Sequence, residues 1–453
     1  MIDIDTLKNR RKRLADLTNI PAILWSGKEI SRNFLANHYP FRPSSHFLYF
    51  AGLPLKNTAI LLKNGDLDLF MDNASPNSSL WYGEIATRDD IASQIGANNA
   101  YPLTELATKT KGAATISVQD ISTYQKQGVI LNRTLAPANQ MTDIDLILIK
   151  AIITLRLIHD QAALTEIKKA VNCSIEAHKI GMQFTKKSAT EAEVRGAIEG
   201  YIISQNMTCA YNSIVTVHGE VLHNNNYNNY LKSGDLLLVD VGAETALGWA
   251  SDITRTWPVS GNFSSSQRDI YDIVLAAHDA CIKAIKPGVE YQDIHLLAAQ
   301  IIAEGLVNLG ILKGNAENLV ERDAHALFFS HGIGHLLGLD VHDMEDLGDL
   351  AGYEEGRTRS ERFGFGYLRL NRPLKADMVV TIEPGFYQVP AILNNPKFRE
   401  KYHKDVNWEQ LEKFSDVRGI RIEDDILVTE TAAKILTEKL PSKALDIEAL
   451  CQS

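Results

Sequence analysis

Short apolar runs alternate with polar, helix-like stretches in the first third of the chain. The runs cover residues 22–25, 46–50, 58–62 and 67–71. Apolar runs of strand length between helical stretches are typical of an α/β arrangement, in which helices cover a buried sheet. The pattern therefore predicts an α/β amino-terminal domain over residues 1–158.

A longer apolar stretch marks the end of this domain. Residues 141–158 are strongly apolar and contain no glycine or proline, and the segment LRLIHDQAALTEIKKA continues the pattern beyond them. An apolar run without a breaker predicts a helix. We expect one helix to bridge two domains, with the boundary near His159.

Residues 159–453 mix helical and strand patterns. Helices are predicted at 163–182, after a capping box of Thr190 and Glu193, and at 264–286 and 291–309. Strands are predicted where β-branched and aliphatic residues dominate, at 213–217, 235–241, 249–259, 377–383 and 419–428. The second domain is therefore predicted to be α+β, with helices packed on a curved, largely antiparallel sheet.

Composition and charge exclude several classes of protein. Of 453 residues, 45% are hydrophobic and 23% are charged, as in globular proteins, and no apolar run approaches the roughly 20 residues that cross a bilayer. The net charge of -10 argues against nucleic acid as a partner, because phosphate binding needs clustered lysine and arginine. One basic cluster, Lys8 to Arg13, is predicted to be the solvated face of an amino-terminal helix. The charged first residues contain no signal segment, so we expect a cytoplasmic protein without a membrane partner.

Cysteine spacing restricts the ligands that a metal could have. The four cysteines are far apart and form no CxxC pair, at Cys173, Cys209, Cys281 and Cys451. Neither a disulfide framework nor a thiolate zinc site is therefore indicated. Any metal must be held by histidine and carboxylate.

Histidines and glycines are concentrated in the segment HGIGHLLGLDVHD, residues 331–343. Three glycines would each cost a helix about 1 kcal/mol, so an extended or turning backbone is predicted. In an extended chain His331 and His335 share a face, whereas His342 joins them only if the backbone turns in between. A buried glycine-rich strand with merely hydrogen-bonded histidines is the alternative.

Four acidic residues have the placement to complete a site around these histidines. Asp240 ends an apolar strand and Asp252 lies in the next one, so the two are predicted to face each other across a hairpin. Glu383 and Glu423 also end or follow predicted strands, although each could alone be a surface carboxylate. Like charges held this close repel each other unless a cation lies between them.

The charge of this set favours two metal ions. Four carboxylates balance two divalent cations, and with one imidazole they suit manganese, cobalt or magnesium better than a soft-ligand zinc site. Two such ions can share a hydroxide and clamp a carbonyl oxygen, which is the chemistry of amide or ester hydrolysis.

Five segments resemble the metal-binding motifs of the aminopeptidase P and prolidase branch of the pita-bread metallopeptidases. They are HGIGHLLGLDVHD, LLLVDVGAE, SDITRTWPV, TIEPGFY and GIRIEDDILVTE, and they follow the family order over most of residues 160–429. The segments RNF and YPFRPSSHFLYFAGL are similar to that branch's amino-terminal domain. The resemblance implies a pita-bread catalytic domain over 159–453 that removes the first residue of a peptide with proline second. It also implies a homodimer or higher homo-oligomer.

The resemblance implies a role for individual residues. Two divalent ions, usually manganese, with Co2+, Zn2+ or Mg2+ possible, would be held by Asp240, Asp252, His335, Glu383 and Glu423. Glu383 would also be the general base, and His331 and His342 would contact the substrate and stabilise the tetrahedral intermediate or the leaving amine. The positions that match the substrate pocket are His223, Tyr387, Arg421 and Trp81.

Two departures from the family pattern leave alternatives open. The hairpin between Asp240 and Asp252 is one residue longer than the commonest spacing. The insert 344–374 contains YLRLNRPL, in which Arg369, or Arg372 in reserve, resembles the prolidase arginine that binds a dipeptide carboxylate. Prolidase is therefore the nearest alternative, ahead of a methionine aminopeptidase, a non-enzymatic member and a two-metal phosphoesterase.

Overall fold

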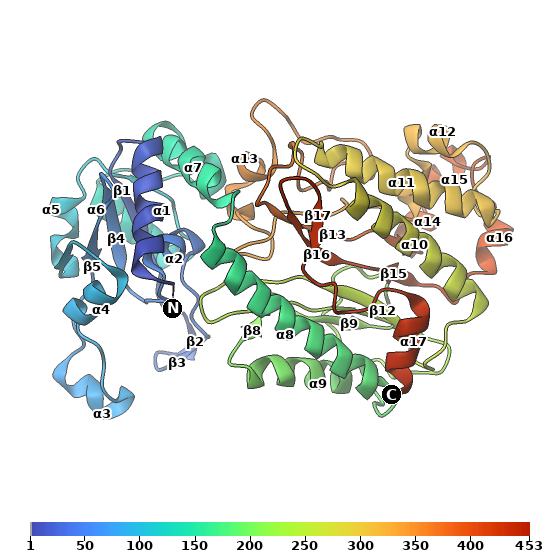
Figure 1. The fold of residues 1–453 in the computed structure, drawn as a ribbon, viewed down its shortest axis with the longest axis horizontal. Helices are drawn as coiled ribbons and strands as arrows, with labels where there is room; N and C mark the ends of the chain where they lie inside the picture. Colours follow the sequence, from blue (N-terminus) through green and yellow to red (C-terminus); the bar gives the residue numbers. More distant parts are fainter. Residues whose placement is uncertain (1) are drawn as a thin grey trace. The chain divides into compact units, whose positions relative to one another are not determined.

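The computed structural model describes residues 2–453 and divides the chain into two compact units (Figure 1). Unit 1 contains Met1–Ile158 with the short segments Ala246–Gly248 and Met344–Ala351, and unit 2 contains the remainder. Among residues 2–453, no helix combines the length and apolar character required to cross a bilayer.

Unit 1 is built on a five-stranded mixed sheet with the strand order β6-β5-β4-β1-β7. Its strands are β1 Ala22–Trp25, β4 Ala59–Lys63, β5 Asp66–Phe70, β6 Asn99–Tyr101 and β7 Ala114–Thr115, beside a hairpin of β2 Ser31–Phe34 and β3 Asn37–His38. Its helices are α1 Ile4–Leu17, α2 Ser45–Ala51, α3 Ser79–Tyr82, α4 Arg88–Ile95, α5 Leu106–Lys109, α6 Ile121–Leu131 and α7 Asp143–Arg156. The α/β class predicted for this part is confirmed.

Two local predictions in unit 1 are wrong. Residues 46–50 form helix α2 rather than a strand, and every residue of this helix is buried. A helix buried on all sides has no polar face, so its apolar run cannot be distinguished from a strand by periodicity.

The basic cluster in α1 is not a solvated face, because Arg10 and Arg11 are buried. Arg10 donates to the Tyr49 carbonyl at 2.9 Å, and the Arg11 guanidinium donates to carbonyls at the ends of α2 and α4.

The predicted bridging helix is interrupted. Helix α7 ends at Arg156, and α8 begins at Gln161. The Asp160 carboxylate accepts from the Ala163 amide at 2.8 Å and so caps the start of α8. This amino-terminal cap, in the sequence HDQAAL, starts a new helix at the border between the two units.

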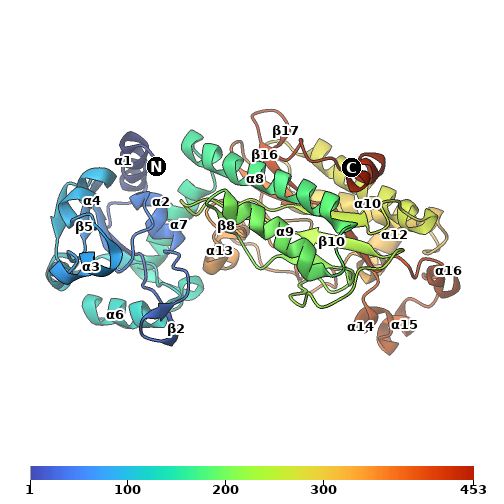
Figure 2. The same ribbon diagram turned by 90° about the horizontal axis from the view of Figure 1, so that it is seen from below.

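Unit 2 combines long helices with short antiparallel strands. Its helices are α8 Gln161–Thr185, α9 Glu191–Ser204, α10 Ser265–Ala284, α11 Tyr291–Asn308, α12 Ala316–Glu321, α14 Pro390–Leu393, α15 Pro396–Lys401, α16 Trp408–Glu412 and α17 Ala444–Gln452, and α13 Asp349–Gly352 lies at the unit border. Its strands are β8 Thr208–Cys209, β9 Ile214–Thr216, β10 Leu236–Asp240, β11 Ala243–Glu244, β12 Thr254–Pro258, β13 Val379–Ile382, β14 Gly385–Tyr387, β15 Gly419–Arg421, β16 Asp424–Val428 and β17 Ala433–Ile435. Helices α8 and α9 pack side by side, as do α10 and α11 (Figures 1 and 2).

Helix starts in unit 2 follow from capping side chains. Ser264 and Gln267 form a capping box at the start of α10. At α9, Thr190 accepts from the Glu193 amide, but the Glu193 carboxylate caps the Ala189 amide instead of that of Thr190. The capping box predicted there is therefore only half formed.

The strand pairs of unit 2 are antiparallel throughout the described residues 2–453. Isolated bridges join the small sheets, between Thr254 and Glu423 and between Leu336 and Val380. The second bridge attaches the predicted histidine segment to β13. The largely antiparallel arrangement predicted for this part is confirmed, and its strand ends meet around one cavity.

Candidate metal centre

The five predicted metal ligands lie at or next to strand ends in unit 2. Asp240 is the last residue of β10, and Asp252 lies two residues before β12. Glu383 follows β13, and Glu423 separates β15 from β16. His335 lies in the histidine segment, which has no helix and contacts β13 through Leu336.

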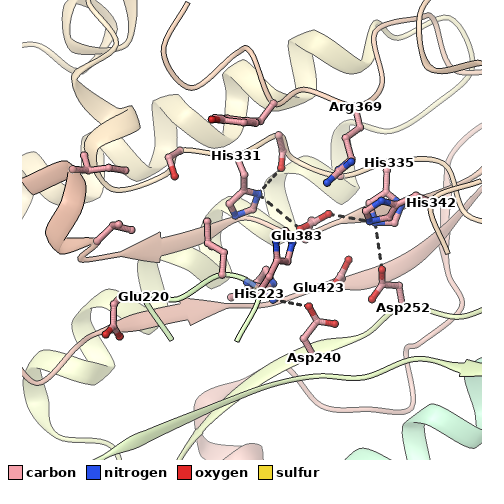
Figure 3. A pocket seen from close by; sticks show the side chains of 18 of the residues that line it. Glu220, His223, Asp240, Asp252, His331, His335, His342, Arg369, Glu383 and Glu423 are labelled. Atoms are coloured by element: carbon pink, nitrogen blue, oxygen red, sulfur yellow. Dashed lines mark hydrogen bonds and ion pairs between the residues drawn. The ribbon is translucent and has the colours of Figure 1, made fainter. Parts of the chain in front are cut away.

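These side chains converge on one cage (Figure 3). Three groups have ligand atoms within 4.8 Å of one another, and they are Asp252 with His335 and His342, His335 with Glu383 and Glu423, and Asp240 with Asp252 and Glu423. The Nε2 atom of His335 lies 3.3 Å from Oδ2 of Asp252 and 3.5 Å from Oε1 of Glu383. All five predicted ligands therefore border the same space.

The backbone of the histidine segment turns between His335 and His342, as the odd spacing of these two residues required. The Asp343 amide donates to the Leu336 carbonyl at 2.9 Å, which closes a turn between the second and third histidines. The rings of His335 and His342 are consequently 4.1 Å apart. His342 thus lies beside the cage, in the group with Asp252 and His335.

Asp240 and Asp252 were predicted to be opposite each other in a strand pair, and this register is wrong. Asp240 pairs with Thr254, two residues beyond Asp252. The two carboxylates are nevertheless close, because the Tyr211 hydroxyl lies within hydrogen-bonding distance of one oxygen of each. The hydroxyl holds both side chains toward the cage although they do not form a strand pair.

Burial and mutual repulsion change the acidity of the cage. Burial, together with the neighbouring Asp240 charge, raises the pKa of Asp252 to about 8. Burial also raises the pKa of Glu383 to about 7, against the opposing effects of His335 and Arg421. The pKa of Glu423 lies well above its ordinary value, because it is buried beside other carboxylates. Without a cation, the cage therefore binds protons near neutral pH.

The donor atoms fit a pair of divalent cations. Oε1 of Glu423 is buried and has no hydrogen-bond partner among residues 2–453, whereas its Oε2 accepts from the Thr254 hydroxyl at 2.7 Å. Nδ1 of His335 lies 3.0 Å from the Leu336 carbonyl oxygen, which can only accept, so Nδ1 carries the hydrogen. The Nε2 lone pair then faces the cage, as in histidine ligands oriented by a carbonyl.

A chain of hydrogen bonds connects the cage to His331. Arg421 donates to Oδ2 of Asp240 at 2.6 Å and to the Tyr387 hydroxyl at 3.0 Å. The Tyr387 hydroxyl lies 2.9 Å from Nε2 of His331, whose Nδ1 donates to the Gly332 carbonyl at 2.7 Å. Burial and the charge of Arg421 lower the pKa of His331 to about 3, so this imidazole is neutral at neutral pH.

The cage opens into a cavity of about 570 Å³ in unit 2. Of the predicted substrate residues, His223, Arg421 and Arg369 line it, as do His331 and His342. Tyr387 is fully buried behind the wall and reaches the cavity through His331 and Arg421. Apolar side chains such as Leu222, Val389 and Ile392 also line it.

Two predicted substrate residues are not among those that line this cavity. The Arg372 guanidinium donates to the Tyr353 carbonyl at 2.7 Å, and Arg372 is not part of the cavity wall, so the reserve assignment is corrected. One nitrogen of this guanidinium is thus paired with a backbone carbonyl away from the cavity, while its buried Nε has no hydrogen-bond partner among residues 2–453. Trp81 lies on α3 in unit 1 with 77% of its side chain exposed. Its place in the substrate pocket stays a prediction.

Sequence reasoning missed the residues that orient the ligands. Besides Tyr211 and Thr254, they are Asp425, whose carboxylate accepts from the Asp252 amide at 3.2 Å, and Thr381, whose hydroxyl accepts from the His335 amide at 3.1 Å. The second aspartate of IEDD was one signal, because an acidic residue inside a buried strand needs a partner. Tyr211 gave no signal, since it lies outside every motif.

Comparison with protein families finds two matches. The model of metallopeptidase family M24 matches residues 165–430, and the aminopeptidase P N-terminal domain matches residues 7–119. The first match contains all the cage residues.

Comparison with individual proteins agrees with the family matches. The chain is 32% identical to a Xaa-Pro aminopeptidase of Haemophilus influenzae over 95% of this chain and 94% of the relative. It is 33% identical to a probable Xaa-Pro aminopeptidase of Sordaria macrospora, over 91% and 87% of the two chains. A zinc-substituted aminopeptidase P of E. coli in complex with product has a similar fold, with a TM-score of 0.81, 28% identity, and coverage of 100% of this chain and 98% of that one.

Proposed function

The chain belongs to metallopeptidase family M24, and from this membership we propose that it removes the first residue from peptides whose second residue is proline. The family's pita-bread fold and its divalent metal site are those expected from the sequence. The relatives named Xaa-Pro aminopeptidase match almost the whole chain, including its amino-terminal domain.

One observation carries the proposal. Four carboxylates and one imidazole converge from distant parts of the chain, and the buried Oε1 of Glu423 has no partner among residues 2–453. Buried carboxylates that repel one another destabilise the fold unless cations occupy the space between them. Divalent ions bound there would polarise a scissile carbonyl and activate a water for attack.

The substrate class follows from the chemistry of the bond. The nitrogen of an Xaa-Pro bond carries no hydrogen, and the ring fixes φ, so a peptidase that grips an extended strand binds such a peptide poorly. A shaped cavity is needed instead. The apolar side chains in its wall, Leu222, Val389 and Ile392, provide a surface for a ring without a hydrogen-bond donor.

Residues of the cavity can carry out the proton transfers of this reaction. Glu383 lies at the border between the cage and the cavity, where its carboxylate can take a proton from the attacking water and give it to the departing proline nitrogen. Both ring nitrogens of the neutral His331 are hydrogen-bonded, to Gly332 and Tyr387, so this residue forms part of the cavity wall without adding charge to it. His342 and His223 lie on the same wall and complete the polar lining.

We propose manganese as the metal in the cell. Carboxylate-rich ligands with one imidazole suit Mn2+, while Co2+, Zn2+ and Mg2+ remain chemically able to bind. Metal analysis of protein purified without added metal tests this. Recovery of two manganese ions per chain is expected, and zinc or magnesium at that stoichiometry would overturn the choice.

The assay that tests the function compares peptides of two lengths. We expect metal-loaded protein to release the first residue from Xaa-Pro-Xaa tripeptides, with no cleavage of matched Xaa-Ala-Xaa peptides. Cleavage restricted to Xaa-Pro dipeptides would instead favour prolidase, for which Arg369 lies in the cavity wall and could bind the terminal carboxylate. If the protein cleaves no proline peptide of either length, both the aminopeptidase and the prolidase assignments are wrong.

We further propose that the protein assembles with copies of itself in the cytoplasm. Helix α3 of unit 1 exposes Leu80, Trp81 and Tyr82 by 78%, 77% and 74%, and contiguous apolar side chains of this kind mark interaction sites. All four cysteines are free, which suits a reducing compartment. Analytical ultracentrifugation should show a dimer or larger assembly, and cell fractionation should place the protein with cytoplasmic markers.

A further inference from the structure

The segment between β9 and β10 brings His223 into the cavity without a direct anchor on its ring. His223 and Leu222 line the cavity wall, and partial burial, with the charges of Arg421 and Arg369, lowers the pKa of His223. Among residues 2–453, no hydrogen bond to the His223 ring is present. The place of this ring must therefore be set by the backbone that carries it.

A crossing of two glycines holds that backbone against β15. A Cβ atom on Gly219 would lie 2.8 Å from the Gly419 carbonyl oxygen, and one on Gly419 would lie 2.3 Å from the Gly219 carbonyl carbon. The two chains are thus in direct backbone contact, closer than any side chain would permit. Gly419 is the first residue of β15, which ends with Arg421 in the cavity wall.

A residue adjacent to each glycine, Glu220 after Gly219 and Arg418 before Gly419, takes part in a two-pronged ion pair. Nε of Arg418 donates to Oε2 of Glu220 at 2.9 Å, and its Nη2 donates to Oε1 of the same carboxylate. The Glu220 side chain is only 6% exposed, and Nδ1 of His218 lies 3.3 Å from Oε1. A guanidinium fork on a carboxylate fixes orientation as well as distance.

The segment has further backbone anchors. The Val217 amide donates to Oε1 of Glu191 at 2.7 Å, and the Val221 amide donates to the His218 carbonyl at 2.8 Å. These bonds fix the beginning and the turn of the segment, and the Glu220 side chain ties it to Arg418, the residue before β15. Figure 3 shows Glu220 at the opposite end of the pocket from Asp252 and His335, with His223 between them.

We propose that Glu220 is a positioning residue, which through its fork with Arg418 sets the place of His223 opposite the substrate. The inference rests on the proposed peptidase function and adds a residue that does not touch the reacting atoms. Removing the fork should let the segment move relative to β15, and small misplacement of a substrate-side group lowers turnover strongly.

A double-mutant cycle on the full, metal-loaded protein tests this role. The variants are Glu220→Gln, His223→Ala and the two together, assayed as kcat/KM on an Xaa-Pro-Xaa tripeptide. We expect Glu220→Gln to lower kcat/KM by about tenfold or more in the wild-type background, and to have almost no effect once His223 is alanine. Arg322→Gln, which removes the surface ion pair with Asp405, is the matched control and should leave kcat/KM unchanged.

The outcomes separate the possibilities. A general structural role would lower kcat/KM by the same factor in both backgrounds, and that result overturns the proposal, as does an unchanged kcat/KM of Glu220→Gln. If Glu220→Gln lowers the melting temperature or the metal content, the same cycle is run with Arg418→Gln, whose side chain is 45% exposed. If the wild-type protein cleaves no proline peptide, the peptidase function itself fails, and this inference fails with it.

Discussion

The Arg421 guanidinium donates to Oδ2 of Asp240 at 2.6 Å, although 181 residues separate the two in the sequence. The same guanidinium donates to the Tyr387 hydroxyl, which contacts His331. One cation therefore orients a cage carboxylate and, through a tyrosine, a histidine of the cavity wall. The metal site and the substrate side are parts of one hydrogen-bonded network, which makes the following effects measurable.

Replacing Tyr387 by phenylalanine should interrupt this network without disturbing the fold. The variant removes only the hydroxyl between Arg421 and His331. We expect kcat to fall by about 10- to 100-fold, because a group held by a hydrogen bond becomes misplaced. Steady-state kinetics and metal analysis check this, and a variant that loses metal instead would assign Tyr387 to the cage.

Replacing Asp252 by alanine should abolish turnover and binding of the second metal together. Asp252 belongs to two of the three ligand groups, the one with His335 and His342 and the one with Asp240 and Glu423. Each of these groups therefore loses a donor in the variant. Mass spectrometry of metals on the purified variant gives the stoichiometry. Asp272→Ala, which removes a surface partner of Arg268, is the control and should keep both ions. Retention of two ions by Asp252→Ala would contradict the cage.

The stability of the metal-free protein should fall as the pH rises from about 7 to about 8. The folded-state pKa values of Asp252 and Glu383 are raised to about 8 and about 7, so the folded chain holds protons that the unfolded chain has released. The buried histidine His331, with a lowered pKa, is neutral in both states in this window and does not contribute.

Thermal melting of chelator-treated protein across this window measures the effect. Added Mn2+ should raise the melting temperature most at the upper end, because the ion replaces the protons of the carboxyl groups. Asp252→Asn should lose much of the pH dependence of the metal-free form. A melting temperature that rises with pH in the absence of metal would contradict the raised pKa values.

Arg369 and Arg372 should respond differently to substitution by methionine. The guanidinium of Arg369 lines the cavity, whereas that of Arg372 donates to a backbone carbonyl outside it. We expect Arg369→Met to lower kcat/KM on tripeptides and dipeptides alike by about tenfold or more, because a charge-assisted contact is lost. A loss confined to dipeptides would favour the prolidase assignment. Arg372→Met should change the melting temperature, with little effect on kcat/KM.

Replacing Arg11 by methionine should destabilise unit 1. Arg11 is 2% exposed and donates to the carbonyls of Ile95 and Gly96 at 2.6 and 2.9 Å, and to that of Phe50 at 3.0 Å. Leaving these carbonyls without a donor should cost about 3 kcal/mol of unfolding free energy. Denaturant unfolding measures it, with the exposed Lys12→Met as the control, which should cost less than about 0.5 kcal/mol.

The sequence was most informative where side-chain chemistry is unusual. Carboxylates at the ends of apolar strands and histidines among glycines are costly to bury, so their types and spacing pointed to a shared cation. The cage in the structure contains Asp240, Asp252, His335, Glu383 and Glu423, as the motifs implied.

Relationships that depend on strand register or on complete burial could not be predicted. The pairing of Asp240 with Thr254 is offset by two residues from the expected partner, and a fully buried α2 has the same apolar pattern as a strand. The ligand-orienting role of Tyr211 depends on a contact across many residues, for which a single sequence contains no signal. The break at Asp160 did have a signal, an acidic cap before QAAL, but the apolar pattern on both sides outweighed it.

The order in which the ligands occur in the chain affects the biosynthesis of the protein. Asp240 and Asp252 leave the ribosome long before Glu383 and Glu423, so a growing chain has two close carboxylates without the donors that complete the cage. The group of Asp252, His335 and His342 is complete once residue 342 has been synthesised, whereas the two groups that contain Glu423 are complete only later, so the ligand groups of the cage are completed in sequence during synthesis.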